Sequence, residues 1–203
     1  MGDDSTERPM ESHARGAPVC WDSDWVTVDV RLRWMTTPGQ VDPFLLQSLA
    51  DCWWQVSNAG GAVGFPFLPV AQSEVQEAAV EMVGLLADAH RLLAANVGGS
   101  LAGWLLLSKN PSPLSSHWGR VTRVQTHPAY RGQGVGVALM REVARAARDE
   151  LHLEQLHLEL RGGLGLEDFY EGLGWEIVGR WPGALRLGEG EDRDEVLMFL
   201  SLA

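Results

Sequence analysis

The strongest constraint on the fold is a glycine-rich run, residues 128–136, that separates an apolar strand-like segment from a long helical pattern. Glycine adopts backbone conformations closed to other residues, so Gly132, Gly134 and Gly136 allow a tight turn with several N–H groups directed at one point. The dipole of the following helix adds partial positive charge there, and Arg131 adds a full one. The turn therefore predicts an anion site that suits a pyrophosphate.

The context argues against two other glycine-rich phosphate sites. A dinucleotide-binding turn would lie in an early βαβ unit with an acid about 20 residues further on, whereas this turn lies far down the chain. A P-loop would need Gly-Lys-Ser/Thr, a tripeptide that the sequence lacks. Taken alone, the turn could still be a flexible connector.

Periodicity predicts the elements around the turn. Strands are expected at residues 25–34, 91–97, 101–107, 119–126, 156–160, 175–181 and 196–200, and helices at 43–56, 73–90, 137–150 and 167–173. Gly98 and Gly99 predict a hairpin between the second and third strands. The order predicts an α/β fold with a mixed, mostly antiparallel central sheet of about seven strands flanked by helices.

Length, composition and charge restrict the class of protein. The 203 residues fit one domain, expected at 23–203 after a disordered acidic arm at 1–22. The sequence has neither an apolar run of 18 residues nor a signal-peptide pattern, which predicts a cytoplasmic protein without a membrane span. A net charge of -11 without a basic patch argues against nucleic acid. Cys20 and Cys52 match no ligand pattern, so neither a disulfide framework nor a metal site is expected.

Three segments resemble the GNAT superfamily of acetyltransferases. Residues 131–136 resemble its Q/R-x-x-G-x-G/A acetyl-CoA signature, residues 124–128 its fourth strand, and residues 168–175 its Phe-Tyr-x-x-x-Gly-Phe segment. The resemblance covers about residues 25–200. It implies the GNAT fold, acetyl-CoA as co-substrate, no metal, and direct attack by an acceptor amine on the thioester.

A closer similarity is to the tabtoxin-resistance type of GNAT enzyme. Residues 60–65, 156–159 and 178–183 carry it. This type implies a small-molecule acceptor such as an amino-acid-like metabolite, an antibiotic or a toxin, and hence a role in antibiotic resistance. A homodimer is common among relatives, although no self-complementary surface pattern in the sequence compels one.

The resemblance also implies which residues hold the cofactor. In the family the fourth and fifth strands diverge, so that unpaired strand backbone binds the pantetheine arm and one N–H polarises the thioester carbonyl. The residues at these positions, together with those of the turn, are Val124, Gln125, Thr126, Arg131, Gly132, Gln133, Gly134, Val135 and Gly136. Tyr170 matches the tyrosine that protonates the departing thiolate. Its alternative role is core packing beside Phe169.

Direct attack requires removal of a proton from the acceptor ammonium, by a side chain or a water chain. Glu159 is the candidate base, because it alternates out of phase with the leucines of its strand. A solvated strand position is the alternative for Glu159, and His157 or His127 could relay a proton. Close relatives carry a second acid where this sequence has Arg120, so Arg120 is expected to bind a carboxylate of the acceptor.

The identity of the acceptor stays open. The resemblance puts acceptor contacts in the glycine-rich loop that contains Gly64 and Phe65. Besides a small molecule, a protein lysine or N-terminus could accept the acetyl group. Because the base is uncertain, a catalytically silent acyl-CoA-binding module is the alternative outside the enzymes.

Overall fold

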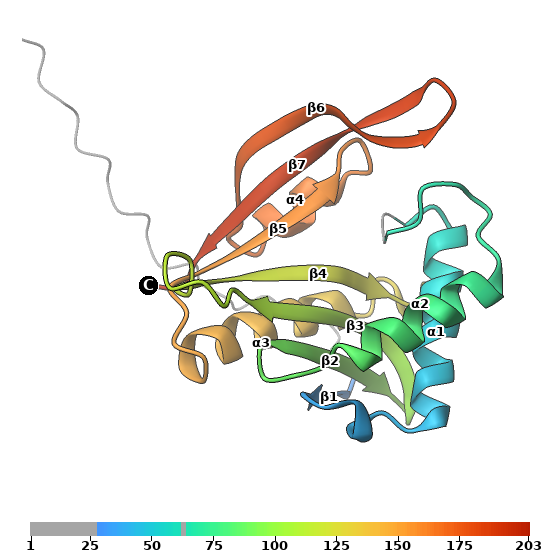
Figure 1. Cartoon of the computed structure of the whole chain (residues 1–203), viewed down its shortest axis with the longest axis horizontal. Helices are drawn as coiled ribbons and strands as arrows, with labels where there is room; N and C mark the ends of the chain where they lie inside the picture. Colours follow the sequence, from blue (N-terminus) through green and yellow to red (C-terminus); the bar gives the residue numbers. More distant parts are fainter. Residues whose placement is uncertain (1–27, 62–63) are drawn as a thin grey trace, which may run out of the picture.

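A computed structural model describes residues 28–61 and 64–203, which form one seven-stranded sheet in the order β1-β2-β3-β4-β5-β7-β6 (Figure 1). The strands are β1 (Val30–Met35), β2 (His90–Val97), β3 (Ser100–Lys109), β4 (Trp118–Thr126), β5 (Gln155–Arg161), β6 (Glu176–Gly188) and β7 (Glu191–Ser201). Among these strands, only β4 and β5 are parallel, and all other neighbours are antiparallel. The predicted mixed, mostly antiparallel sheet is confirmed.

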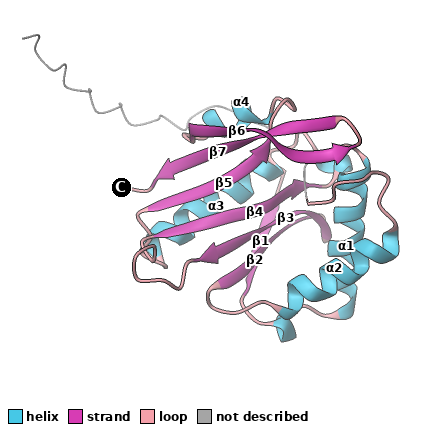
Figure 2. Cartoon of the chain, turned by 45° about the horizontal axis from the view of Figure 1, so that its top comes forward, coloured by secondary structure: helices cyan, strands magenta, loops and turns pink. Residues whose placement is uncertain are grey.

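Helices cover both faces of the sheet (Figure 2). They are α1 (Pro43–Asn58), α2 (Gln72–Gly84), α3 (Val135–Asp149) and α4 (Leu166–Glu171), with short 3-10 turns at Pro38–Gln40 and Pro128–Tyr130. One core cluster joins α1 and α2 to the sheet through Trp53 and Trp104, and the other joins α3 through Leu139 and Val143. Among the described residues, no helix combines the length and apolar character needed to cross a membrane.

Local sequence signals explain where α1 and the central hairpin begin. Asp42 caps α1 by accepting a hydrogen bond of 2.8 Å from the N–H of Leu45, and Pro43 occupies the first turn, where its missing N–H costs nothing. Gly98 and Gly99, with φ of 58° and 86°, make the turn between β2 and β3. Both elements were predicted from these residues.

Two element boundaries in the first half of the chain differ from the sequence prediction. β1 begins at Val30, so residues 28 and 29 of the expected strand lie before it, and residues 1–27, including the expected acidic arm, lie outside the described part. The second predicted helix ends at Gly84 instead of continuing to His90. Ala87 and His90 pair across a tight turn, and His90 already belongs to β2, so strand pairing takes precedence over the helical pattern there.

The last two strands are much longer than predicted. They form a twisted hairpin at the edge of the sheet (Figure 1). Pro182 and Gly183 interrupt the alternating pattern of β6, and the register with β7 shifts between Trp181 and Leu185 to accommodate them. Proline is tolerated here because β6 is an edge strand, where an N–H need not enter a ladder.

One polar contact ties the first strand to the long helix beneath it. The indole N–H of Trp34 donates to Glu142 at 2.8 Å, and Arg145 donates to the same carboxylate through two nitrogens, each at 2.8 Å. The hydrogen bond from Arg145 is the main cause that lowers the pKa of Glu142 from 4.5. A lowered pKa means that this contact stabilises the fold above about pH 4.5 and loses its effect as the pH falls below that value.

We predict that Glu142→Ala lowers the free energy of unfolding by about 1–2 kcal/mol at pH 7, because the indole N–H loses its acceptor. Glu142→Gln keeps an amide oxygen for Trp34 and should lose less. Urea unfolding of both variants at pH 7 and pH 4 measures this, and the difference between the alanine variant and the wild type should shrink at the lower pH. Equal stability of all three proteins at pH 7 would contradict the assignment.

Candidate active site

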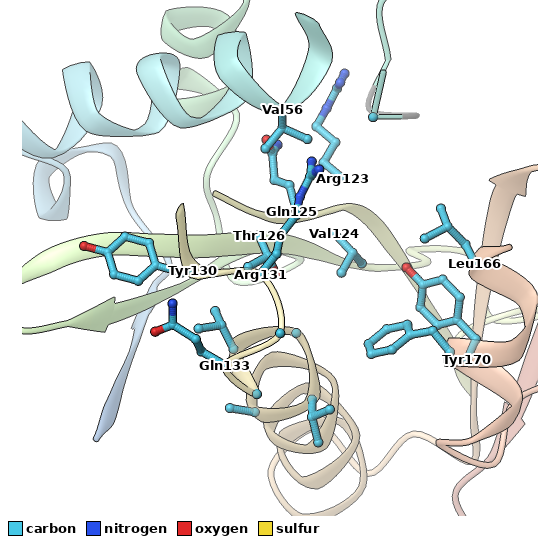
Figure 3. Close-up of a pocket in the computed structure, with 18 of the residues that line it drawn as sticks. Val56, Arg123, Val124, Gln125, Thr126, Tyr130, Arg131, Gln133, Leu166 and Tyr170 are labelled. Carbon is cyan, nitrogen blue, oxygen red and sulfur yellow. The ribbon is translucent and has the colours of Figure 1, made fainter. Parts of the chain in front are cut away.

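A cavity of about 1070 Å³ opens between β4 and β5 and extends to the end of α1 and the start of α3 (Figure 3). Most of the sequence-predicted site residues line it: Val124, Gln125, Thr126, Arg131, Gly132, Gln133, Gly134, Val135, Gly136, Glu159 and Tyr170. Arg120, Gly64 and Phe65 are not among its lining residues. The tertiary structure therefore brings together segments that lie far apart in the chain.

The cavity exists because β4 and β5 separate. Their parallel ladder joins Trp118, Gly119 and Arg120 to the first residues of β5, and the pairing stops there although both strands continue. Beyond that point Val124 and Thr126 on one side face Leu158 and Leu160 on the other across the cavity. The open edge of β4 consequently presents backbone N–H and C=O groups to the cavity instead of to β5, as the sequence resemblance implied.

The glycine turn forms one end of the cavity. Gly132 and Gly134 have φ of 73° and 81°, values that residues with a side chain rarely adopt, and Gly134 is the N-cap of α3. The first N–H groups of this 15-residue helix lack intrahelical partners and point toward the turn. Gln133 braces the turn through its side-chain N–H, which donates to the Ala129 carbonyl at 2.9 Å. This geometry suits the anion site that the glycines predict.

Gly136 and Arg131 complete this end. A Cβ at Gly136 would lie 3.3 Å from the ring of Phe169, which is a crowded distance, and 3.5 Å from the hydroxyl of Thr126, which is an ordinary contact. Arg131 is exposed, and its positive charge acts on the thiol of Cys52 in α1. Burial raises the pKa of the Cys52 thiol to about 12, and Arg131 acts in the opposite direction.

Tyr170 reaches the cavity from α4 and is only 7% exposed. Its ring contacts Phe169 and Trp175 edge-on, at centroid distances of 5.0 and 6.1 Å. Burial raises its pKa well above 10, so the phenol stays protonated throughout the neutral range. Figure 3 shows the hydroxyl directed away from α4 into the cavity. Core packing and access to the cavity, which sequence reasoning treated as alternatives, therefore coexist.

Glu159 lines the opposite wall and is paired with Arg120. The two side chains approach to 3.4 Å, with 22% of the glutamate and 50% of the arginine side chain exposed. Arg120 is not among the residues that line the cavity, and the structure places it beside the candidate base. Glu195 on β7 does not line the cavity, but its carboxylate interacts with Glu159: its pKa is raised chiefly by burial and also by the charge of Glu159.

The two candidate histidines are held by structural contacts. His127 accepts the N–H of Ala129 at 3.2 Å through Nδ1 and so caps the turn that follows β4. His157 stacks on Trp118 at 4.6 Å and lies 3.3 Å from the side-chain oxygen of Gln155. Burial is the main cause that lowers the pKa of His157. Neither histidine lines the cavity.

Arg123 was missed by sequence reasoning, although it lines the cavity beside the end of α1. Its φ of 53° is unusual for a residue with a side chain, and it lies where the β3 and β4 register shifts. The guanidinium carbon is 4.4 Å from the ring centroid of Trp53. A Cβ at Gly64 would collide with the Arg123 guanidinium, so this glycine allows the loop to lie against it. A local bulge of this kind has no clear sequence signal.

Across residues 28–61 and 64–203, the structure holds no group of three or more His, Cys, Asp or Glu side chains arranged to bind a metal ion.

Comparison with known families identifies the family of this fold. Residues 48–175 match the profile described as the acetyltransferase (GNAT) family. This segment contains β4, the glycine turn, α3, β5 and α4, and therefore nearly all of the cavity wall.

Solved structures share the fold. A candidate phosphinothricin N-acetyltransferase has 19% identity and a TM-score of 0.69, with 86% of this chain and 99% of that chain covered. A candidate acetyltransferase from Salmonella typhimurium, solved with its cofactor acetyl-CoA, has 14% identity and a TM-score of 0.63, with coverages of 86% and 95%. The ribosomal-protein-S18-alanine N-acetyltransferase of Escherichia coli has 15% identity and a TM-score of 0.59, with coverages of 85% and 95%.

Proposed function

The chain belongs to the GNAT family of acetyltransferases, and we propose that it transfers the acetyl group of acetyl-CoA to the amine of a small molecule by direct attack. The observation that carries this proposal is the cavity in which the open edge of β4 meets the glycine turn at the start of α3. This combination offers backbone hydrogen bonds to an extended arm and an N-terminal helix dipole to a pyrophosphate. The similarity to a candidate phosphinothricin N-acetyltransferase favours an amino-acid-like metabolite, antibiotic or toxin as acceptor.

We assign the cofactor contacts to the residues predicted from sequence. Gly132, Gly134 and the first N–H groups of α3 would hold the pyrophosphate, with Arg131 supplying positive charge. Backbone groups from Val124 to Thr126 would bind the pantetheine arm, and one of their N–H groups would stabilise the oxyanion that forms on the thioester carbonyl. Acetyl-CoA supplies an activated thioester, so no enzyme nucleophile is required.

Two side chains would carry out the proton transfers, one as general base and the other as general acid. Glu159 would take the proton from the acceptor ammonium, and Arg120, 3.4 Å away, would hold the carboxylate in place. Tyr170, on the other side of the cavity, would donate its proton to the departing thiolate, a role that suits a phenol kept neutral by burial.

The proposal is tested by following release of CoA from acetyl-CoA across small amines, amino acids, antibiotics and peptides, beside a binding titration with acetyl-CoA alone. We expect tight binding and stimulation by small amines. Stimulation by peptides alone would replace the proposal with a protein acetyltransferase. Binding without stimulation by any amine would indicate a catalytically silent acyl-CoA-binding module.

Gly134→Ala tests the cofactor end of the cavity. Alanine at a φ of 81° costs roughly 1–2 kcal/mol, so a turn that relaxes to avoid this strain should lose about tenfold in acetyl-CoA affinity. Gly39→Ala is the matched control, since a Cβ meets nothing within 4 Å at either position but only Gly134 has a positive φ. Calorimetric titration compares the two variants, and unchanged affinity in Gly134→Ala would remove the turn from the cofactor site.

Tyr170→Phe should lower kcat by roughly a hundredfold or more while leaving acetyl-CoA affinity nearly unchanged, because only the proton donor is lost. Because the phenol has a raised pKa, wild-type activity should not decline through Tyr170 ionisation below about pH 10. Steady-state kinetics from pH 6 to pH 9.5 measures both effects. Wild-type turnover in the phenylalanine variant would leave Tyr170 with a packing role alone.

Glu159→Gln should lower kcat/KM roughly a hundredfold at pH 7 and recover as the pH rises, because a larger fraction of the acceptor then arrives as free amine. Glu154→Gln, at an exposed position just before β5, controls for the loss of one negative charge. The pH profile separates the roles, since a residue that only stabilises the fold would lower activity by the same factor at every pH. That flat profile would argue against Glu159 as the base.

A further inference from the structure

The cavity wall next to α1 holds a cation and an amide that the proposed transfer of the acetyl group does not use. Arg123 and Gln125 lie two residues apart on β4, and Figure 3 draws both side chains rising toward Val56 at the end of α1. Gln125 pairs across the sheet with Trp104, which belongs to the α1 and α2 core cluster. The glycine turn at the start of α3 lines another part of the same cavity.

Gln125 is the unusual member of the pair. Its side chain is buried, with the residue 2% exposed, and both its amide oxygen and its amide nitrogen lack a hydrogen-bond partner among the described residues. A buried amide of this kind normally has a partner, because the water that it lost must be replaced. Because Gln125 lies in the wall of the cavity, we infer that a bound ligand supplies the missing partner once the side chain turns toward it.

Arg123 is fixed in place by the fold. The positive φ at the β4 bulge turns its side chain toward α1, and the guanidinium lies 4.4 Å over the ring of Trp53. Burial lowers the pKa of Arg123, which reflects the cost of taking this charge out of water. Stacking uses the face of a guanidinium, whereas hydrogen bonds lie in its plane, so one group can contact both an aromatic ring and an oxyanion.

We propose that Arg123 and Gln125 form a carboxylate seat, in which the acceptor of the acetyl group is held by an anionic carboxylate. This inference rests on the proposed function and narrows its substrate class to amines that carry a carboxylate. The N–H donors of Arg123 match the two oxygens of a carboxylate, and the amide N–H of Gln125 adds a donor. Glu159 lines the cavity from β5, on the other side of the gap. In a zwitterionic acceptor, the carboxylate would therefore bind Arg123 and the ammonium group would lie toward Glu159.

The carboxylate seat replaces the role that sequence reasoning gave to Arg120. Arg120 lies outside the cavity and pairs with Glu159, whereas Arg123 lines the cavity three residues further along the same strand. The two arginines therefore predict different defects. Loss of Arg123 should affect only acceptors with a carboxylate, and loss of Arg120 should affect all acceptors through the base.

The experiment compares matched acceptors in the full-length protein. Free L-amino acids and the corresponding L-amino acid amides are each supplied with acetyl-CoA, and kcat/KM is measured for every pair. We expect the acids to exceed their amides by about tenfold or more. Equal rates for acid and amide would overturn the carboxylate seat and leave the proposed function intact. Binding of acetyl-CoA with no acetylation in either series would instead remove the proposed function, and the inference with it.

Substitutions of single arginines test which residue causes the preference for acids over amides. Arg123→Gln should lower kcat/KM for the acids by about 30-fold or more and change the amides little. Arg120→Gln should lower acids and amides by the same factor. Arg148→Gln, on an exposed part of α3, controls for the loss of one positive charge. An unchanged ratio of acid to amide in Arg123→Gln would overturn the assignment.

Gln125→Met separates a binding role from a structural one. Methionine keeps the shape and removes an unpartnered buried amide, so the melting temperature should stay equal or rise. The kcat/KM ratio of acid to amide should fall severalfold at the same time. An unchanged ratio would remove Gln125 from the carboxylate seat, whatever the melting temperature of the variant.

Discussion

The separation of β4 from β5 beyond Arg120 is the feature on which the rest of the site depends. A parallel pair in a continuous ladder would satisfy its backbone groups internally and leave no space between the strands. Here the ladder stops after three residue pairs, and the gap becomes the cavity. The core cluster under α3 contains residues of both strands, Val121 of β4 and Leu156, Leu158 and Leu160 of β5, so packing against one helix holds the two strands that border the gap.

Charge is distributed unevenly between the surface and the cavity. The chain carries 27 acidic against 16 basic residues, yet the described residues that line the cavity include the arginines Arg123, Arg131 and Arg141, with only Asp29 and Glu159 as acids. Such a cavity concentrates positive potential in a negative molecule, and a partly apolar wall strengthens each interaction because local screening by water is reduced. Anionic groups of a cofactor and an acceptor are the ligands that this arrangement favours.

Features encoded by neighbouring residues were predicted correctly from the sequence, whereas features that depend on distant strands were not. Asp42 and Pro43 at the start of α1, and Gly98 and Gly99 in the hairpin, act through their own backbone and were read correctly. The end of α2 and the length of β6 depend on pairing with distant strands, which outweighs local pattern, and there the prediction was wrong. The same holds for the site residues: the glycines predicted the turn, whereas no local pattern predicted that Arg123 lines the cavity.

By itself the sequence determined the glycine turn, the helix behind it, the alternation that directs Glu159 away from the core, and the family to which these belong. These features are encoded within a few residues, as allowed φ values, periodicity and capping. Only the tertiary structure decided that Arg120 pairs with Glu159 and that Arg123, through a bulge at positive φ, enters the cavity beside Gln125. Those outcomes depend on register and on contacts between strands and helices far apart in the chain, which no local pattern records.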